Sequence, residues 1–303
     1  MNDTRVIALG FFDGVHLGHQ ALMKRTTDRA KELGVRPAVI SFDVHPDTIV
    51  RGEEVPLLGS VADRKDLIAR IGGIDDTIMI HFDRRFMQLP WDVFLSSVKE
   101  DLGAVHLVMG SDFCCGYKGC GTSERIAQWC AENGMGSDIV QKVELDGVTV
   151  SSTYIRNLVL QGDMERAAMF LGHPHTLMDT VGYGYKLGRS IGAPTINTRI
   201  PEGVIVPRHG VYATRVWLPE GPKPAVTNVG VRPTFENDDC LTVESNILDF
   251  EGNLYGSQVR LEFLHFLRDE QKFPSPEALG KQIRMDIAST RAFFNSLNTN
   301  DNE

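Results

Sequence analysis

Long apolar runs and an excess of basic residues are both missing from this sequence of 303 residues. No stretch approaches the ~18 consecutive apolar residues that a membrane-spanning helix needs, so we expect no membrane partner. The N-terminus leads into the strand-like run 6–9 without a basic region or a cleavage site, which predicts a cytoplasmic protein. Lys and Arg number 31 against 40 Asp and Glu, a formal charge of −9. Because nonspecific nucleic-acid binding needs clustered cations, we expect no nucleic-acid partner.

The five cysteines are an odd number and form no recognisable zinc-binding pattern. Cys114, Cys115 and Cys120 lie in one glycine-rich loop, with no histidine nearby at ligand spacing. Reduced thiols, as in a cytosolic enzyme, are the favoured interpretation, and metal binding is the alternative. The sequence leaves the oligomeric state open.

The first half alternates short apolar runs with helix-like segments. The predicted strands are 6–9, 38–42, 77–80 and 105–109, and the predicted helices are 19–34, 64–71 and 91–102. This alternation predicts an α/β domain with a parallel sheet, in which ligands bind at the carboxyl ends of the strands. A further helix over 164–171 precedes Gly172-His173-Pro174, so we expect one domain at 1–174 and another at 175–303.

The second half has a different pattern. Short β-rich runs such as 210–216 and 258–263 are separated by Gly, Pro and Asn/Asp turns, which predicts a small antiparallel β-barrel. A C-terminal helix is predicted to begin at Ser275-Pro276-Glu277, because a capping residue precedes a proline there.

The segment Gly10-Phe11-Phe12-Asp13-Gly14-Val15-His16-Leu17-Gly18-His19 ends a predicted strand and opens a helix. A helix N-terminus offers free N–H groups and partial positive charge, which suit phosphate. His16 and His19 are three residues apart, so both imidazoles can face one ligand, and Gly18 leaves room between them. Two such donors suit a triphosphate attacked at its α-phosphorus. The alternative is a pair of surface histidines beside a turn.

Two further segments of the first half carry polar side chains. Ser151-Ser152-Thr153-Tyr154-Ile155-Arg156 combines hydroxyl groups with a guanidinium, which favours a phosphate-binding role, and a helix cap is the alternative. The glycine-rich turn 110–119 contains Asp112, and by itself it is weak evidence for a binding site.

A glycine-rich run over 181–197 is the main polar motif of the second half. Its glycines let backbone approach a phosphate, and Arg189 can offset the phosphate charge. Thr195 and Asn197 flank one residue, so on a strand their oxygens point the same way and suit Mg²⁺. The Walker pattern is missing, so a kinase here is not a P-loop kinase. A flexible glycine-rich hairpin is the alternative.

Together these segments resemble the bacterial bifunctional riboflavin kinase/FAD synthetase (FMN adenylyltransferase) family. The resemblance extends from about Val6 to Phe294, and it rests on segments 12–20, 42–46, 110–113, 151–156, 188–197, 228–235, 244–256 and 267–273. It implies a Rossmann-like nucleotidyltransferase domain with a parallel sheet, followed by an antiparallel β-barrel riboflavin kinase domain with a C-terminal helix.

The resemblance also implies the chemistry. ATP would phosphorylate riboflavin to FMN and then adenylylate FMN to FAD, releasing pyrophosphate, with Mg²⁺ as cofactor. Glu244 would be the catalytic base of the kinase, Thr195 and Asn197 would bind Mg²⁺, and His16 and His19 would be catalytic in adenylylation. The implied ATP- and phosphate-binding residues are Gly10, Phe11, His16, His19, Asp112, Ser152, Thr153, Arg156, Gly182, Gly188 and Arg189.

The sequence departs from the family pattern at Cys115, Ala193, Ile196 and Asn246. We expect these departures to change local packing and substrate affinity without removing activity. Three alternatives stay open at this point: one active module beside an inactive scaffold, a non-catalytic flavin or nucleotide sensor, and an adenylyltransferase with another phosphate acceptor.

Overall fold

A computed structural model describes residues 4–182, 195–232 and 240–300 of the chain. Its contacts divide the chain into two compact units, Met1–Leu57 with Val61–Ser152 and Leu58–Ser60 with Thr153–Glu303. The helices that follow Ser152 therefore pack with the second unit. The functional boundary between residues 174 and 175 stays a prediction.

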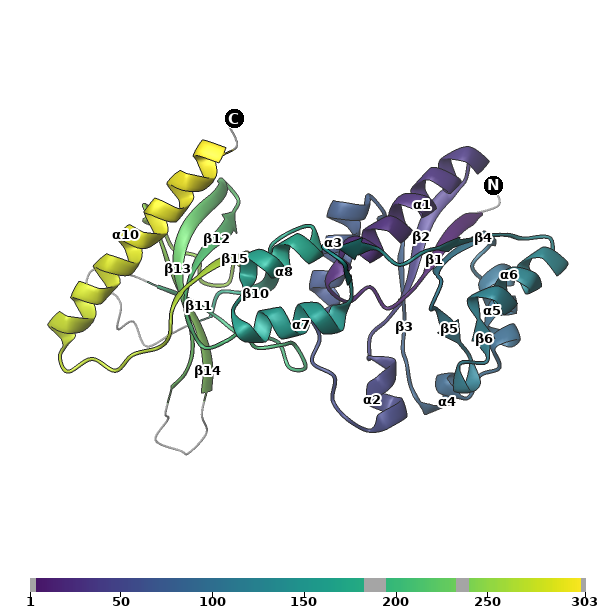
Figure 1. Cartoon of the computed structure of the whole chain (residues 1–303), viewed down its shortest axis with the longest axis horizontal. Helices are drawn as coiled ribbons and strands as arrows, with labels where there is room; N and C mark the ends of the chain where they lie inside the picture. The colour runs from purple at the N-terminus through teal and green to yellow at the C-terminus, as the bar shows by residue number, and fades with distance from the viewer. Residues whose placement is uncertain (1–3, 183–194, 233–239, 301–303) are drawn as a thin grey trace. The chain divides into compact units, whose positions relative to one another are not determined.

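The first unit is built on a five-stranded parallel sheet with the strand order β3-β2-β1-β4-β7. Figure 1 labels the first four of these strands. The predicted parallel sheet is confirmed, and β7 is a fifth strand that the sequence analysis missed. The strands are β1 (Arg5–Leu9), β2 (Arg36–Phe42), β3 (Thr77–Ile80), β4 (Ala104–Gly110) and β7 (Gly136–Val140). Two short hairpins are made by β5 (Cys114–Cys115) with β6 (Gly121–Thr122) and by β8 (Glu144–Leu145) with β9 (Val148–Thr149).

The connections between these strands are mainly helical, as parallel pairing requires. They are η1 (Asp13–Val15), α1 (Leu17–Leu33), α2 (Pro46–Arg51), α3 (Val61–Gly72), α4 (Arg84–Met87), α5 (Trp91–Glu100), η2 (Tyr117–Gly119) and α6 (Ser123–Glu132). The three predicted helices correspond to α1, α3 and α5, whereas α2, α4 and α6 were not predicted.

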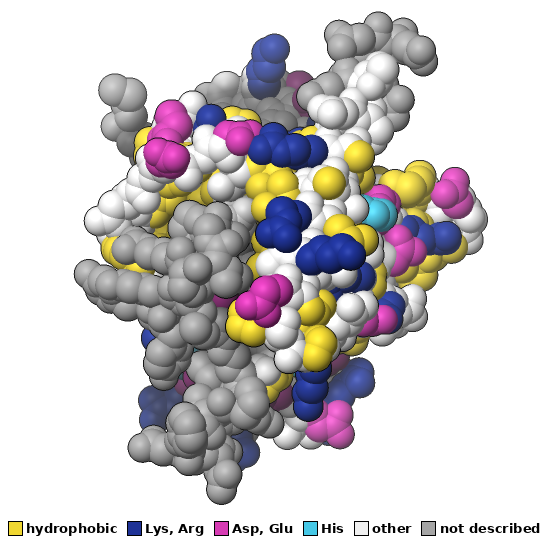
Figure 2. Space-filling view, turned by 90° about the vertical axis from the view of Figure 1, so that its left-hand side faces the viewer, with side chains coloured by type: hydrophobic (Ala, Val, Ile, Leu, Met, Phe, Trp, Pro, Cys, Tyr) yellow, Lys and Arg dark blue, Asp and Glu magenta, His cyan; other side chains and the backbone are white. Residues whose placement is uncertain are grey.

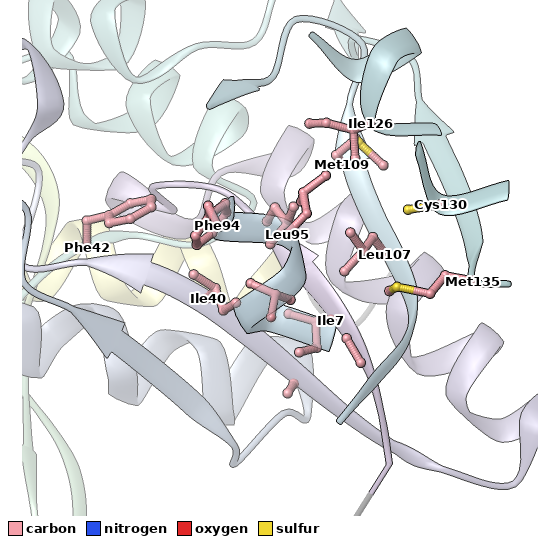
Figure 3. Close-up of a cluster of buried hydrophobic side chains, with 14 residues drawn as sticks. Ile7, Ile40, Phe42, Phe94, Leu95, Leu107, Met109, Ile126, Cys130 and Met135 are labelled. Atoms are coloured by element: carbon pink, nitrogen blue, oxygen red, sulfur yellow. The ribbon is translucent and has the colours of Figure 1, made fainter. Parts of the chain in front are cut away.

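Alternation along the strands divides the core of this unit between the two faces of the sheet. On one face Ile7 and Ile40 pack with Phe94 and Leu95 of α5 and with Ile126 of α6 (Figure 3). On the other face the intervening strand residues pack against α1 and α3, in a cluster that includes Val6, Ala8, Val39, Val108, Met23 and Ile68. Helices therefore cover both faces and leave the strand ends as the place for a ligand.

The second unit contains a six-stranded sheet with the order β10-β15-β12-β13-β14-β11. The strands are β10 (His175–Thr180), β11 (Ile196–Thr198), β12 (Gly210–Leu218), β13 (Gly221–Arg232), β14 (Cys240–Ile247) and β15 (Gln258–Arg268). Every pairing is antiparallel. The two edge strands approach where the backbone N–H of Gly182 donates to the carbonyl of Asn197 at 2.9 Å. The sheet is thus a curled half-barrel, and full closure stays a prediction.

Among the described residues, the helices that belong wholly or mainly to the second unit are α7 (Ser152–Gln161), α8 (Met164–Leu171) and α10 (Pro276–Asn300). The predicted start of the last helix is confirmed, because the Ser275 hydroxyl accepts a hydrogen bond from the Ala278 N–H at 3.2 Å. Helix α10 packs against β12, β13 and β15. It is also held by an ion pair between Arg268 and Asp286 at 2.7 Å. On the face shown in Figure 2, side chains of both charges lie among apolar ones.

His175 is a buried ionisable group of this half-barrel. Its side chain is 2% exposed on β10, and Phe263 lies opposite it in the strand register. Within the described part of the chain, its Nε2 atom has no hydrogen-bond partner. Burial lowers the pKa of His175 to about 3, with a smaller contribution from His173. The imidazole is therefore neutral in the folded protein at pH 7.

Acid should destabilise the fold through His175. The unfolded chain binds a proton there near pH 6.5, whereas the folded chain does so only near pH 3. This one group should cost up to about 1.4 kcal/mol per pH unit as the pH falls from about 6 to 3. His175→Phe should reduce that slope. Urea unfolding of both proteins at pH 7, 5 and 4 measures the difference, and equal slopes would contradict it.

Candidate active sites

The first candidate site is a pocket of about 560 Å³ at the carboxyl ends of four parallel strands. Residues that follow β1, β2, β4 and β7 all line it, as expected for an open parallel sheet. The sequence-predicted residues that the structure brings together there are Gly10, Phe11, His16, His19, Asp112 and Ser152.

His16 and His19 form a stacked pair at the start of α1. Their ring centroids are 3.7 Å apart, and the ring planes differ by 14°. His16 is the N-cap residue, and its Nδ1 accepts a hydrogen bond from the His19 backbone N–H at 3.4 Å. A neutral His16 therefore carries its proton on Nε2. A Cβ atom at Gly18 would lie 3.2 Å from the His16 ring, so glycine keeps this pair uncrowded.

The electrostatics of the pair favour a neutral His19 ring. Burial lowers the pKa of His19 well below 6.5, and the nearby His16 and Arg64 lower it further. At pH 7 His19 is therefore an uncharged imidazole, which acts as a hydrogen-bond donor without placing a second positive charge beside Arg64.

The loop before α1 has an unusual backbone. Phe12 and Val15 have positive φ values of 59° and 44°, a conformation that costs free energy for side chains other than glycine. The Ser152 hydroxyl donates to the Asp13 carbonyl at 3.1 Å and so ties the loop to the start of α7. Because a hydroxyl has one proton, Ser152 can reach a phosphate as a donor only by giving up this bond.

His45, Asp47 and Lys142 also line this pocket, and the sequence analysis assigned none of them a role in the site. Lys142 forms an ion pair with Asp112 at 3.1 Å. It follows β7, and the sequence analysis did not predict that strand. Recognition of 136–140 as a strand would have placed Lys142 at the ligand-binding edge.

Thr153 and Arg156 lie together on α7, where Arg156 Nη1 donates to Thr153 Oγ1 at 3.5 Å. Both belong to the second compact unit. Among the described residues that line the first pocket, Ser152 is the last in the sequence. The part of Thr153 and Arg156 in phosphate binding stays a prediction.

The second candidate site lies on the curled sheet, where strand register aligns polar residues. Asn197 of β11 pairs with Glu244 of β14, and Glu244 pairs with Asn228 of β13. Paired residues of adjacent strands project to the same face, so these three side chains form a row across the sheet. Asn228 Nδ2 also donates to Glu270 Oε1 at 3.4 Å, which places a second carboxylate beside the row.

A pocket of about 400 Å³ lies in the same unit. Its lining residues include Val181, Thr195, Ile196 and Ser245, together with the segment Phe250–Tyr255. Ile196 and Ser245 are paired in the register and both line the pocket, so the pocket lies on the face of the sheet opposite Asn197 and Glu244. Gly182 pairs with Asn197, whereas Gly188, Arg189 and Ala193 lie outside the described residues.

Comparisons with known proteins match each of the two parts of the chain to a protein family. A family model described as FAD synthetase matches residues 1–154, and one described as riboflavin kinase matches residues 171–294. Bifunctional riboflavin kinase/FMN adenylyltransferases from Listeria monocytogenes and Pseudomonas fluorescens are 36% and 37% identical. The alignments cover 97% and 95% of this chain and 94% and 92% of theirs. The chain belongs to this bifunctional family. The resemblance inferred from the sequence motifs is thereby confirmed.

A solved structure from Streptococcus pneumoniae, described as a macrolide-efflux protein, shares the fold with a TM-score of 0.83 and 28% identity. The superposition covers 95% of this chain and 94% of that one. Within the described residues, we find no helix with the length and hydropathy of a membrane span. Cytoplasmic location stays a prediction.

The role of His16 as the N-cap of α1 can be tested separately from its predicted role in phosphate binding. His16→Ala removes the side-chain acceptor at the start of α1 and should lower the free energy of unfolding by about 1 kcal/mol. His16→Asn supplies another capping oxygen and should remain within about 0.5 kcal/mol of the wild type. Urea unfolding of the three proteins measures this. Equal losses in both variants would show that the cap contributes nothing.

Proposed function

We propose that this chain makes FAD from riboflavin in two successive ATP-dependent transfers. The observation that carries the proposal is that each family-matched part of the chain has its own polar site, the stacked histidine pair in one and the Asn197–Glu244–Asn228 row in the other. We assign FMN adenylyltransferase to residues 1–174 and riboflavin kinase to residues 175–303.

In the kinase site, Glu244 acts as general base. It takes the proton of the riboflavin 5′-hydroxyl while that oxygen bonds to the γ-phosphorus of ATP and the bond to ADP breaks. The position of Glu244 in the middle of the polar row supports this role, because neighbouring strands fix it from both sides. Gly182, Gly188 and Arg189 are assigned to the ATP phosphates.

Thr195 and Asn197 would hold a Mg²⁺ ion in this site. Their hydroxyl and amide oxygens are hard, neutral ligands, and the Glu244 carboxylate lies opposite Asn197 in the register. When bound, the ion neutralises phosphate charge. The two side chains orient the triphosphate toward Glu244.

In the adenylyltransferase site, a phosphate oxygen of FMN attacks the α-phosphorus of ATP and pyrophosphate leaves. His16 and His19 donate hydrogen bonds to the phosphates at the α1 N-terminus, where the free N–H groups add partial positive charge. Ser152, Thr153 and Arg156 are assigned to the remaining phosphate oxygens. Asp112 is assigned to the nucleotide and flavin, and the backbone of Gly10 and Phe11 to ATP.

This assignment predicts direct in-line transfer, because no side chain of the first pocket is needed as a nucleophile. Positioning and charge neutralisation then supply most of the rate enhancement. A trapped adenylyl-enzyme would contradict this mechanism.

One incubation tests the function of the whole chain. The purified protein with riboflavin, ATP and Mg²⁺, followed by chromatography, should form FMN first and then FAD. Accumulation of FMN without FAD would contradict the assignment of residues 1–174 as the adenylyltransferase. Formation of FAD from supplied FMN, with no phosphorylation of riboflavin, would contradict the assignment of residues 175–303 as the kinase. Flavin binding without ATP turnover would indicate a sensor.

Substitutions at the two sites should separate the reactions. Glu244→Gln should lower riboflavin phosphorylation at least 100-fold, in the range expected for loss of a general base, and leave FMN adenylylation within about twofold. His19→Ala is the reciprocal control and should impair only adenylylation. Initial rates are measured separately with riboflavin and with FMN. Loss of both activities in either folded variant would contradict this division of labour.

A further inference from the structure

Arg64 of α3 is a charged side chain in the interior of the first unit, and the sequence motifs did not indicate it. It is 1% exposed. Its Nη1 donates to the Ser41 hydroxyl at 3.0 Å and to the Phe42 carbonyl. The Ser41 hydroxyl in turn donates to the Phe11 carbonyl at 2.7 Å. Arg64 therefore links the ends of β1 and β2, two of the four strands that lead into the pocket.

Arg64 also lies against a pocket-lining side chain. Its guanidinium carbon is 4.1 Å from the centroid of the Phe11 ring, a cation–π geometry. Phe11 contacts His45 on another side, with ring centroids 4.7 Å apart in an edge-on arrangement. Phe11 and His45 both line the pocket. Movement of the guanidinium would thus move part of the pocket wall.

The charge of Arg64 is only partly compensated. Within the described residues, its Nε and Nη2 atoms have no hydrogen-bond partner and no carboxylate forms an ion pair with it. Burial lowers the pKa of Arg64, while Asp13 and Asp43 oppose this effect through space. A buried charge without a close counter-ion is costly, and an apolar residue would fill the space at lower cost. An anion bound in the pocket would offset this cost.

We propose that Arg64 is a positioning residue for adenylyl transfer, one that holds Phe11 in the pocket wall and supplies fixed positive charge beneath an anionic nucleotide and flavin phosphate. This role rests on the proposed function of the first unit. Arg64 acts through Phe11 and through its electric field, because its burial prevents contact with the substrate.

The same positive charge acts on His19. The groups around His19 are His16 from the helix cap and Arg64 from α3, while His45, Asp47, Asp112 and Lys142 line the same pocket. His16 and Arg64 both lower the pKa of His19. Removal of the Arg64 charge should therefore raise the pKa of His19 and move the acid limb of the adenylylation profile to higher pH.

The test compares three variants of the full-length protein. Arg64→Met keeps much of the side-chain volume and removes the charge, whereas Arg64→Lys keeps the charge and loses the planar contact with Phe11. Arg70→Met is the matched control on the same helix, where Arg70 pairs with Asp66 at 3.3 Å. Urea unfolding and the far-UV circular dichroism of each variant report whether the first unit is folded.

The readouts are kcat/KM for FMN adenylylation against pH and the NMR titration of the His19 imidazole. Arg64→Met should lower kcat/KM at least tenfold and raise the pKa of His19. Arg64→Lys should lose part of kcat/KM while keeping the wild-type pKa. Arg70→Met should match the wild type in both readouts.

An unchanged kcat/KM and an unchanged His19 titration in folded Arg64→Met would overturn the proposal. If Arg64→Met does not fold, wild-type kcat/KM in Arg64→Lys would overturn it. If the wild type itself forms no FAD from FMN, the proposed function fails. The His19 titration then still tests the electrostatic effect of Arg64.

Discussion

The parallel pairing of β1 with β2 and β4 is the constraint on which the first site depends. Each strand enters the sheet in the same direction, so the residues after Leu9, Phe42 and Gly110 meet at one edge. Helix α1 then begins at this edge with its free N–H groups beside the pocket. The stacked histidines, the Asp112 loop and Arg64 all take their positions from that arrangement.

The second site depends on antiparallel register in the same way. A shift of one residue between β11 and β14 would turn Glu244 to the opposite face from Asn197. The polar row is therefore fixed by backbone pairing across three strands, and buried residues on the other face hold that register. Val243 and Ser245 flank Glu244 and are buried, so a slip would expose the apolar Val243 side chain and break the hydrogen bond between the Ser245 and Thr227 hydroxyls.

Much of the architecture could be predicted from local sequence patterns. The elements that were not predicted were missed for physical reasons. The apolar runs of β1 to β4 are bounded by turn residues, so they were recognised. Gly-Ser-Asp-Ile-Val of β7 has few apolar residues and lies at the sheet edge, so its pattern was too weak to predict a strand. Lys142 was missed with it. The stacked pair was predictable because His16 and His19 are close in sequence, whereas Arg64 reaches the pocket only through tertiary contacts.

The sequence by itself determined the family, the division into two parts with different strand patterns, and the residue types of both sites. These features depend only on the order of residues within short segments of the chain. Tertiary structure decided which residues meet. It placed Ser152 on the Asp13 carbonyl, Asn197 opposite Glu244, and Arg64 beneath Phe11. Those contacts join residues distant in sequence, and strand pairing and burial bring them together only after the chain has folded.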